Sequence, residues 1–241
     1  MKRTLLHILT VLSAIAFLQA CSVKDAFPDN GPTYYPDSSY YSSNYGGYDA
    51  GPDGSYTSVV TVKKDEEGKV YLLLAGELRL YPYGTVPYEH QYRAMTSVRQ
   101  AAQPENGRAP VTVQWLEPID DGIFTTDTSV QGADGIDLNT KSWITTSDDG
   151  YLTLHYSTQW GRHPVHHDFY LVAGTVPSEP YTLELRHNAN GDLQEEEGEG
   201  IINFDINTLP DTGESTRIIH LKWINTRGEA EAADFGFKTR K

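Results

Sequence analysis

Residues 200–209 read GIINFDINTL, and this stretch decides the fold class. Ile202, Phe204 and Ile206 alternate with the polar residues between them. A period of two places the apolar side chains on one face of a strand and the polar ones on the other. One buried face and one wet face are typical of an antiparallel sheet.

The same alternation recurs through the second half of the chain. In residues 217–223, Ile219, Leu221 and Trp223 oppose His220 and Lys222. About seven such strands over residues 122–241 predict a β-sandwich. The other strand candidates are SWITT (142–146), YLTLHYSTQW (151–160), PVHHDFYLVA (164–173), YTLELRHNA (181–189), TRIIHLKWIN (216–225) and ADFGFKT (233–239).

A second patterned region occupies residues 56–121. It holds YTSVVTVKK (56–64), KVYLLLAG (69–76), a short alternation at Glu77–Tyr81 and APVTVQWLE (109–117). Four or five short strands in this length predict a small OB-like barrel. Residues 88–103 lack a strand pattern, and we expect a short helix there. The chain is therefore predicted to be all-β, with a barrel followed by an antiparallel sandwich.

The charge and cysteine content exclude several classes of function. The net charge is −14, and so acidic a chain should not bind nucleic acid, whose phosphates require Lys and Arg. Cys21 is the single cysteine, which rules out an intramolecular disulfide and a CxxC zinc site.

Residues 1–20 have the layout of an export signal. Lys2 and Arg3 precede an apolar stretch that is too short to span a bilayer, and Leu18–Cys21 resembles the lipobox of bacterial lipoproteins. The resemblance implies cleavage after Ala20 and acylation of Cys21, which would anchor the chain in a lipid bilayer. The alternative is an ordinary secretory signal cut near Ala20, with Cys21 an incidental thiol. Ser22 after the cysteine favours the outer membrane, and the membrane face is left open.

Residues 21–55 are expected to form a tether. The segment is built from Tyr, Ser, Gly, Pro and Asp without a hydrophobic period, which is typical of disorder. A flexible coil of this length spans on the order of 30 Å. Its tyrosines either reflect low complexity or contact sugars and proteins.

Several runs together resemble the NigD-like lipoproteins of Bacteroides-type bacteria. They are YLTLHYSTQW, VHHDFYLV, LELRHNANGD, GIINFDINTL and IIHLKWINTRGE in the second region, and VVTVKK, VYLLL and LRLYPYGTVP in the first. The resemblance implies an exported lipoprotein with an OB-like domain, a carboxyl-terminal sandwich, a proposed immunity role and no established catalytic residues. This chain has a longer insert at 88–109 and a shorter stretch after Trp115. The last barrel strand is therefore either truncated or supplied by residues 121–130.

The run HPVHHDF (163–169) invites a metal-site interpretation. On a strand, His166 and His167 point to opposite faces, and His163 and His167 are about 13 Å apart at Cα. A local metal site is therefore not expected, and no cofactor is predicted. A weaker candidate metal constellation consists of His155, His166 and His220, each on the polar face of its strand, which would cluster only if those strands are neighbours.

The acidic run NANGDLQEEEGEG (188–200) offers carboxylates suited to calcium. Its spacing fails the EF-hand rule, because Gly191 comes too early relative to Asn188. We expect a solvated hairpin loop there. No GxSxG elbow, P-loop or GxGxxG motif is present, so no catalytic residue is assigned.

Three functions remain open for this chain, with no ligand-binding residues assigned. The first is a non-catalytic envelope protein, with an immunity-like role, that binds an unidentified protein partner. The second is a surface glycan-binding lipoprotein that uses the tether tyrosines, Trp143 or Trp160. The third is a metal-assisted hydrolase that uses the scattered histidines.

Overall fold

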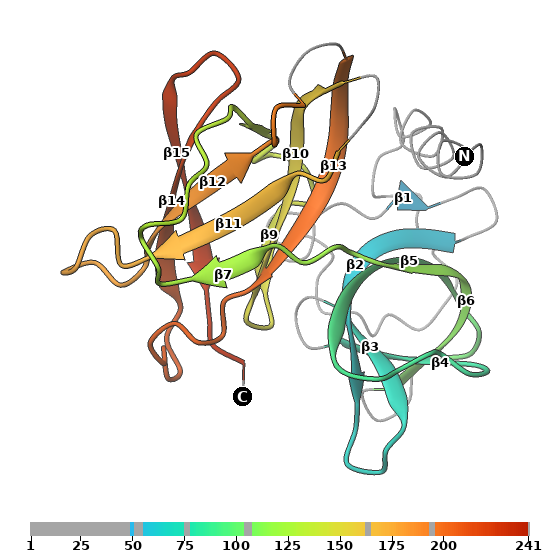
Figure 1. Cartoon of the computed structure of the whole chain (residues 1–241). Helices are drawn as coiled ribbons and strands as arrows, with labels where there is room; N and C mark the ends of the chain where they lie inside the picture. The colour runs from blue at the N-terminus through green and yellow to red at the C-terminus, as the bar shows by residue number, and fades with distance from the viewer. Residues whose placement is uncertain are drawn as a thin grey trace.

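The computed structural model describes residues 49–50, 55–74, 78–103, 108–161, 165–192 and 196–240 (Figure 1). Every regular element in these ranges is a strand, as the composition predicts. In Figure 1 the strands form a closed barrel on the right and a group of packed sheets on the left. The predicted all-β architecture, a small barrel followed by a sandwich, is confirmed.

The amino-terminal barrel closes through five strands. Each strand pairs with two others in the order β2–β3–β4–β6–β5–β2, and the short β1 (Asp49–Ala50) adds to β2. Only the β4–β6 pair is parallel. The interior is filled by aliphatic side chains such as Val60, Leu72 and Leu80, each of which contributes about 1.5–3 kcal/mol on burial. The strands are β2 (Ser55–Lys64), β3 (Val70–Leu74), β4 (Leu78–Pro82), β5 (Tyr92–Gln100) and β6 (Arg108–Pro118).

The short helix expected in residues 88–103 is wrong. This segment contains β5, whose residues are buried on both faces over most of its length. Arg93 is buried on one face and Ala94 on the other, so no contrast between apolar and polar positions marks the strand in the sequence. The last barrel strand is also complete, because β6 runs to Pro118 without help from residues 121–130.

The carboxyl-terminal sandwich consists of two packed sheets. One contains β13, β10 and β8 in that order, with β9 also on β10, and the other has the order β15–β14–β12–β11–β7. Most pairs are antiparallel, and β7–β11 and β12–β14 are parallel. The strands are β7 (Ile123–Thr125), β8 (Asp137–Leu138), β9 (Thr146–Asp148), β10 (Tyr151–Trp160), β11 (Asp168–Ala173), β12 (Thr182–Asn188), β13 (Glu196–Asp205), β14 (Arg217–Ile224) and β15 (Ala230–Phe237).

The sandwich core follows the alternation in the sequence. Phe204 on β13 and Leu221 on β14 are fully buried between the sheets. The expected strand SWITT is wrong except at its end, because residues 142–145 form a turn and β9 begins at Thr146. Residues 121–130, considered as a source of the last barrel strand, instead supply β7 at the edge of the second sheet of the sandwich.

The barrel and the sandwich pack against each other through an apolar patch and two ion pairs. The patch contains Val59 from β2 together with Ile119 and Ile144. Beside it, Lys63 Nζ lies 3.0 Å from Asp149 Oδ1, and Arg93 Nη1 lies 3.5 Å from Asp148 Oδ2. These contacts hold the two parts of the chain together.

Candidate functional site

The three histidines proposed as a scattered metal constellation do not come together. His155 lies on β10 in the first sheet, whereas His220 lies on β14 in the second and His166 precedes β11. His220 pairs with Asp234, with Nδ1 and Oδ1 2.7 Å apart. No group of three or more His, Cys, Asp or Glu side chains in the described ranges is arranged to hold a metal ion.

His155 is not on a wet face as expected, because it is buried. The turn at residues 139–145 folds over it, with Ser142 Oγ 3.0 Å from His155 Nδ1. On the other side of the ring, Nε2 is 3.3 Å from Glu199 Oε2. These contacts assign His155 to the packing of the turn onto the sheet.

The run HPVHHDF separates into an exposed and a buried histidine. His163 lies outside the described residues. The side chain of His166 is 89% exposed, whereas that of His167 is 1% exposed, as the alternation predicts. His167 therefore belongs to the interior of the sandwich, and the chemistry of this run has to be sought there.

His167 is the centre of a cluster that also contains Trp160, His187 and Asp192, which we call the histidine cluster. The rings of His167 and Trp160 stack with their centroids 3.8 Å apart. His167 Nδ1 and His187 Nε2 are 2.9 Å apart and share a hydrogen bond, in which the protonated nitrogen is the donor and the other is the acceptor. His167 Nε2 lies 3.6 Å from Asp192 Oδ2, an electrostatic contact longer than a hydrogen bond.

Asp192 is held by the backbone around it. Its Oδ1 accepts a hydrogen bond from the Gly161 N–H at 2.8 Å, and its Oδ2 accepts one from the Val165 N–H at 3.1 Å. The carboxylate thereby ties both ends of the connection between β10 and β11 to the turn after β12. It is buried, so it is not the solvated loop residue that was expected.

Burial sets the protonation of the histidine cluster. Desolvation lowers the pKa of His167, and Asp192 opposes this by favouring the charged ring. Desolvation also lowers the pKa of His187, and the neighbouring His167 lowers it further. Both rings are therefore neutral at neutral pH.

The sequence carries a signal that His187 is buried. In LELRHNA, His187 has the same parity as Leu183 and Leu185, which places it on the buried face of β12. A histidine in register with two core leucines predicts a buried ring that needs a polar partner. No local signal predicts that the partner is His167, because that contact depends on the pairing of β11 with β12.

The acidic run was expected to be a hairpin loop throughout, and this is wrong from Glu196 onward. Residues 196–200 form the start of β13 and pair with the end of β10. Two glycines there allow rings to lie flat on the strand. A Cβ on Gly198 would come within 2.7 Å of the Trp160 ring, and one on Gly200 within 2.5 Å of Tyr156. The run EEGEG is thus strand sequence shaped by its aromatic neighbours.

The tryptophans proposed for stacking on sugars are engaged in packing. Trp143 packs with Val59 and Ile144 where the barrel meets the sandwich. Trp160 stacks on His167 and packs against the sandwich core. The tether tyrosines from Tyr34 to Tyr48 lie outside the described residues.

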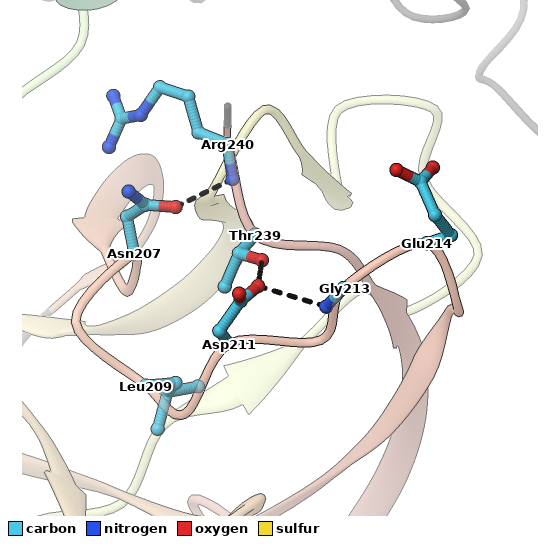
Figure 2. A pocket seen from close by; sticks show the side chains of 7 residues that line it. All are labelled: Asn207, Leu209, Asp211, Gly213, Glu214, Thr239 and Arg240. Carbon is cyan, nitrogen blue, oxygen red and sulfur yellow. Dashed lines mark hydrogen bonds between the residues drawn. The ribbon is translucent and has the colours of Figure 1, made fainter.

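A pocket of about 410 Å³ lies near the carboxyl terminus, and Figure 2 shows its lining. Its polar groups largely satisfy one another. Asp211 Oδ1 accepts hydrogen bonds from the Gly213 N–H at 2.9 Å and the Thr239 Oγ1–H at 2.8 Å. Asn207 Oδ1 accepts one from the Arg240 N–H. These bonds fix the last residues of the chain onto the loop after β13.

A smaller cavity of about 190 Å³ opens where β12 and β14 separate, and we call it the split cavity. It is lined by residues of both strands, by Ala230 of β15 and by residues 132–134. Beside it, the outer face of the β14–β15 hairpin carries exposed apolar side chains. Ile218 is 48% exposed and Ile224 is 37% exposed, opposite Gly236 and Ala230 on β15.

The model of the NigD-like C-terminal beta sandwich domain matches residues 117–237, which is half of the chain. The chain belongs to the NigD-like family. This confirms the family indicated by the resemblance of its strand sequences. A search of curated proteins finds no significant match.

Solved structures of other bacterial proteins share the fold of this NigD-like chain. A Parabacteroides distasonis protein provisionally described as toxin-related is 24% identical, with a TM-score of 0.64 over 76% of this chain and 93% of its own. A NigD-like immunity protein of Bacteroides caccae is 16% identical, with a TM-score of 0.52 over 73% and 91%. A Bacteroides fragilis protein provisionally described as a lipoprotein is 14% identical, with a TM-score of 0.55 over 78% and 99%.

Proposed function

We propose that this NigD-like chain is a lipid-anchored protein of the outer membrane that binds a protein partner and has no catalytic role. Two findings support a binding role. The chain belongs to the NigD-like family, and one of its structural neighbours is named an immunity protein. The lipobox-like sequence ending at Cys21 supports the anchor. A structural neighbour provisionally described as a lipoprotein agrees with an envelope location. None of the described segments forms a helix long and apolar enough to cross a membrane.

The observation that carries the binding role is the outer face of the β14–β15 hairpin. Ile218 and Ile224 are exposed at its two ends, and the residues opposite them on β15 are glycine and alanine. Small residues beside exposed isoleucines make a flat surface on which a partner can approach the backbone closely. An apolar surface with polar residues among its members, here His220 paired with Asp234, is typical of a protein–protein contact.

Site-specific photo-crosslinking in the native host tests the binding role. A photoreactive amino acid at position 218 or 224 is expected to yield the same discrete crosslinked species from either position. Tyr83, which is 64% exposed on the barrel, provides the matched control, and the species should be absent from that position. Crosslinks of equal yield from all three positions would contradict a partner on the hairpin face.

The anchor is tested separately by metabolic labelling with a palmitate analogue. The wild-type chain should take up the label and sediment with outer membranes. Cys21→Ala should remove the label and release the chain from the membrane. An unlabelled wild-type chain would favour the ordinary secretory signal. Protease shaving of intact cells with an epitope tag after Lys241 then decides which membrane face the protein occupies.

A further inference from the structure

The split cavity results from the way in which two strands diverge. β12 and β14 pair in parallel only from Thr182–Glu184 and His220–Lys222. Beyond this point residues 132–136 enter between them. The Asp134 N–H donates to His187 O, and the Ile136 N–H donates to Ile224 O, each at 3.0 Å. A hollow of about 190 Å³ remains, lined by all three segments.

The lining of the split cavity is largely apolar. Ala133, Leu185, Trp223, Ile224 and Ala230 contribute to it. Ile224 is exposed although it lies on a strand, which leaves one wall of the cavity open to solvent. Such a site favours a ligand with an apolar body.

Two hydrogen-bond donors of the lining residues lack partners. Lys222 makes no ion pair or hydrogen bond with any described residue, and its neighbour across the ladder, Glu184, is bonded to Arg186 at 2.8 Å. Trp223 is 4% exposed, and its buried Nε1–H has no acceptor within the described part of the chain. A buried indole N–H without an acceptor is unusual and is stabilised by one.

Two further polar atoms of the lining are already engaged, whereas His187 Nδ1 has no hydrogen-bond partner among the described residues. Asp134 Oδ2 accepts a hydrogen bond from the Ala189 N–H at 2.8 Å. His187 Nε2 is committed to His167. The Lys222 ammonium and the Trp223 Nε1–H beside an apolar wall therefore favour a ligand that brings an acceptor.

We propose that the split cavity binds an apolar group that ends in a carboxylate. The carboxylate pairs with the Lys222 ammonium, and the apolar part lies against Ile224 and Ala230. The volume is about six times the ~30 Å³ share of one water molecule, which suits a short branched or aromatic acid. The acid is either a free small molecule or the last residue of a polypeptide, and both present the same chemistry. This proposal does not depend on the protein partner proposed above.

Titration of the ¹⁵N-labelled mature chain, followed by amide chemical shifts, tests the proposal. The probes are isovalerate and phenylacetate, their neutral amides, and a short peptide ending in leucine with a free or an amidated carboxyl terminus. The acids should shift the amides of residues 133–134 and 222–224 in the millimolar range. The amides should bind about tenfold more weakly or not at all, since they lack the charge that pairs with Lys222.

Matched variants identify the site. Lys222→Gln should weaken binding of the acids about tenfold, whereas Lys238→Gln, a lysine outside the lining, should leave it unchanged. Ala230→Leu should fill the cavity and weaken acids and amides alike. Tighter binding of the peptide than of the free acids would identify a polypeptide terminus as the source of the carboxylate. Tighter binding of the free acids would identify a small molecule. No shifts at residues 222–224, or binding that is indifferent to Lys222→Gln, would overturn the proposal.

Discussion

Two of the places where polar side chains are buried in the described part of the chain differ in how the burial is compensated. Where the barrel meets the sandwich, Arg93 is buried as a cation beside Asp148, and its Nη1 donates to Thr61 Oγ1 at 2.9 Å. Inside the sandwich, His167 and His187 are kept neutral and share one hydrogen bond. The Arg93–Asp148 pair depends on a compensated charge, and the His167–His187 pair depends on the absence of charge. Each site should therefore be destabilised by a different change.

Removal of the buried cation should have the largest effect. Arg93→Ala leaves the partly buried Asp148 without its counter-charge, and burial already raises the pKa of that carboxyl. We expect the free energy of unfolding to fall by about 3–5 kcal/mol, measured by urea denaturation. Arg99→Ala, which removes an exposed arginine from the same strand, should change it by less than about 0.5 kcal/mol. Similar losses for the two variants would refute a structural role for the buried pair.

Truncation of the central ring of the histidine cluster should come next. His167→Ala removes the ring stacked on Trp160 and leaves His187 Nε2 without its partner. Cavity formation and the unmet polar group together predict a loss of about 2–4 kcal/mol. The exposed His166→Ala serves as the control, and a loss of equal size there would show that the cluster contributes little.

Addition of a side chain beneath the rings should have a smaller effect. In Gly200→Val the new Cβ would lie 2.5 Å from the Tyr156 ring, which must move. Overpacking of this kind costs about 1–3 kcal/mol. Thermal denaturation of Gly200→Val and of Gly228→Val separates this clash from backbone strain. Gly228 is a turn glycine whose added Cβ meets nothing within 4 Å, and its φ of 77° strains a valine without a clash. If only the turn variant is destabilised, the packing argument fails.

Acid should destabilise the protein through the histidine cluster. The pKa of each buried histidine is below its ordinary value near 6.5, so the unfolded state binds protons first as the pH falls. Stability is thus fully present above about pH 6.5 and declines below it, by at most about 1.4 kcal/mol per pH unit per histidine. Urea midpoints at pH 7.5 and 5.0 measure this decline, which His167→Phe combined with His187→Phe should reduce. An unchanged decline in the double variant would assign the acid sensitivity to other groups.

The sequence was most informative where one face of a strand is wet. The alternation in β13 and β14 predicted both strands and their buried residues, and the resemblance of these runs to NigD-like proteins predicted the family that the domain match confirms. β5 was missed because both of its faces are buried, which removes the period from the sequence. The histidine cluster joins the last residue of β10, the residue before β11, the end of β12 and the turn after it, so its geometry depends on strand pairing that no local pattern encodes.

The glutamates on β13 have a consequence for how copies of the protein behave together. β13 is the outer strand of its sheet, and its far end is covered where the Gly122 N–H donates to Asn203 O. The near end is uncovered by any described strand, and there Glu196, Glu197 and Glu199 are exposed. A bare strand edge is a template for aggregation, and closely spaced negative charges repel an identical edge. The charges of Glu196, Glu197 and Glu199 thus disfavour pairing between the β13 edges of two copies of the protein.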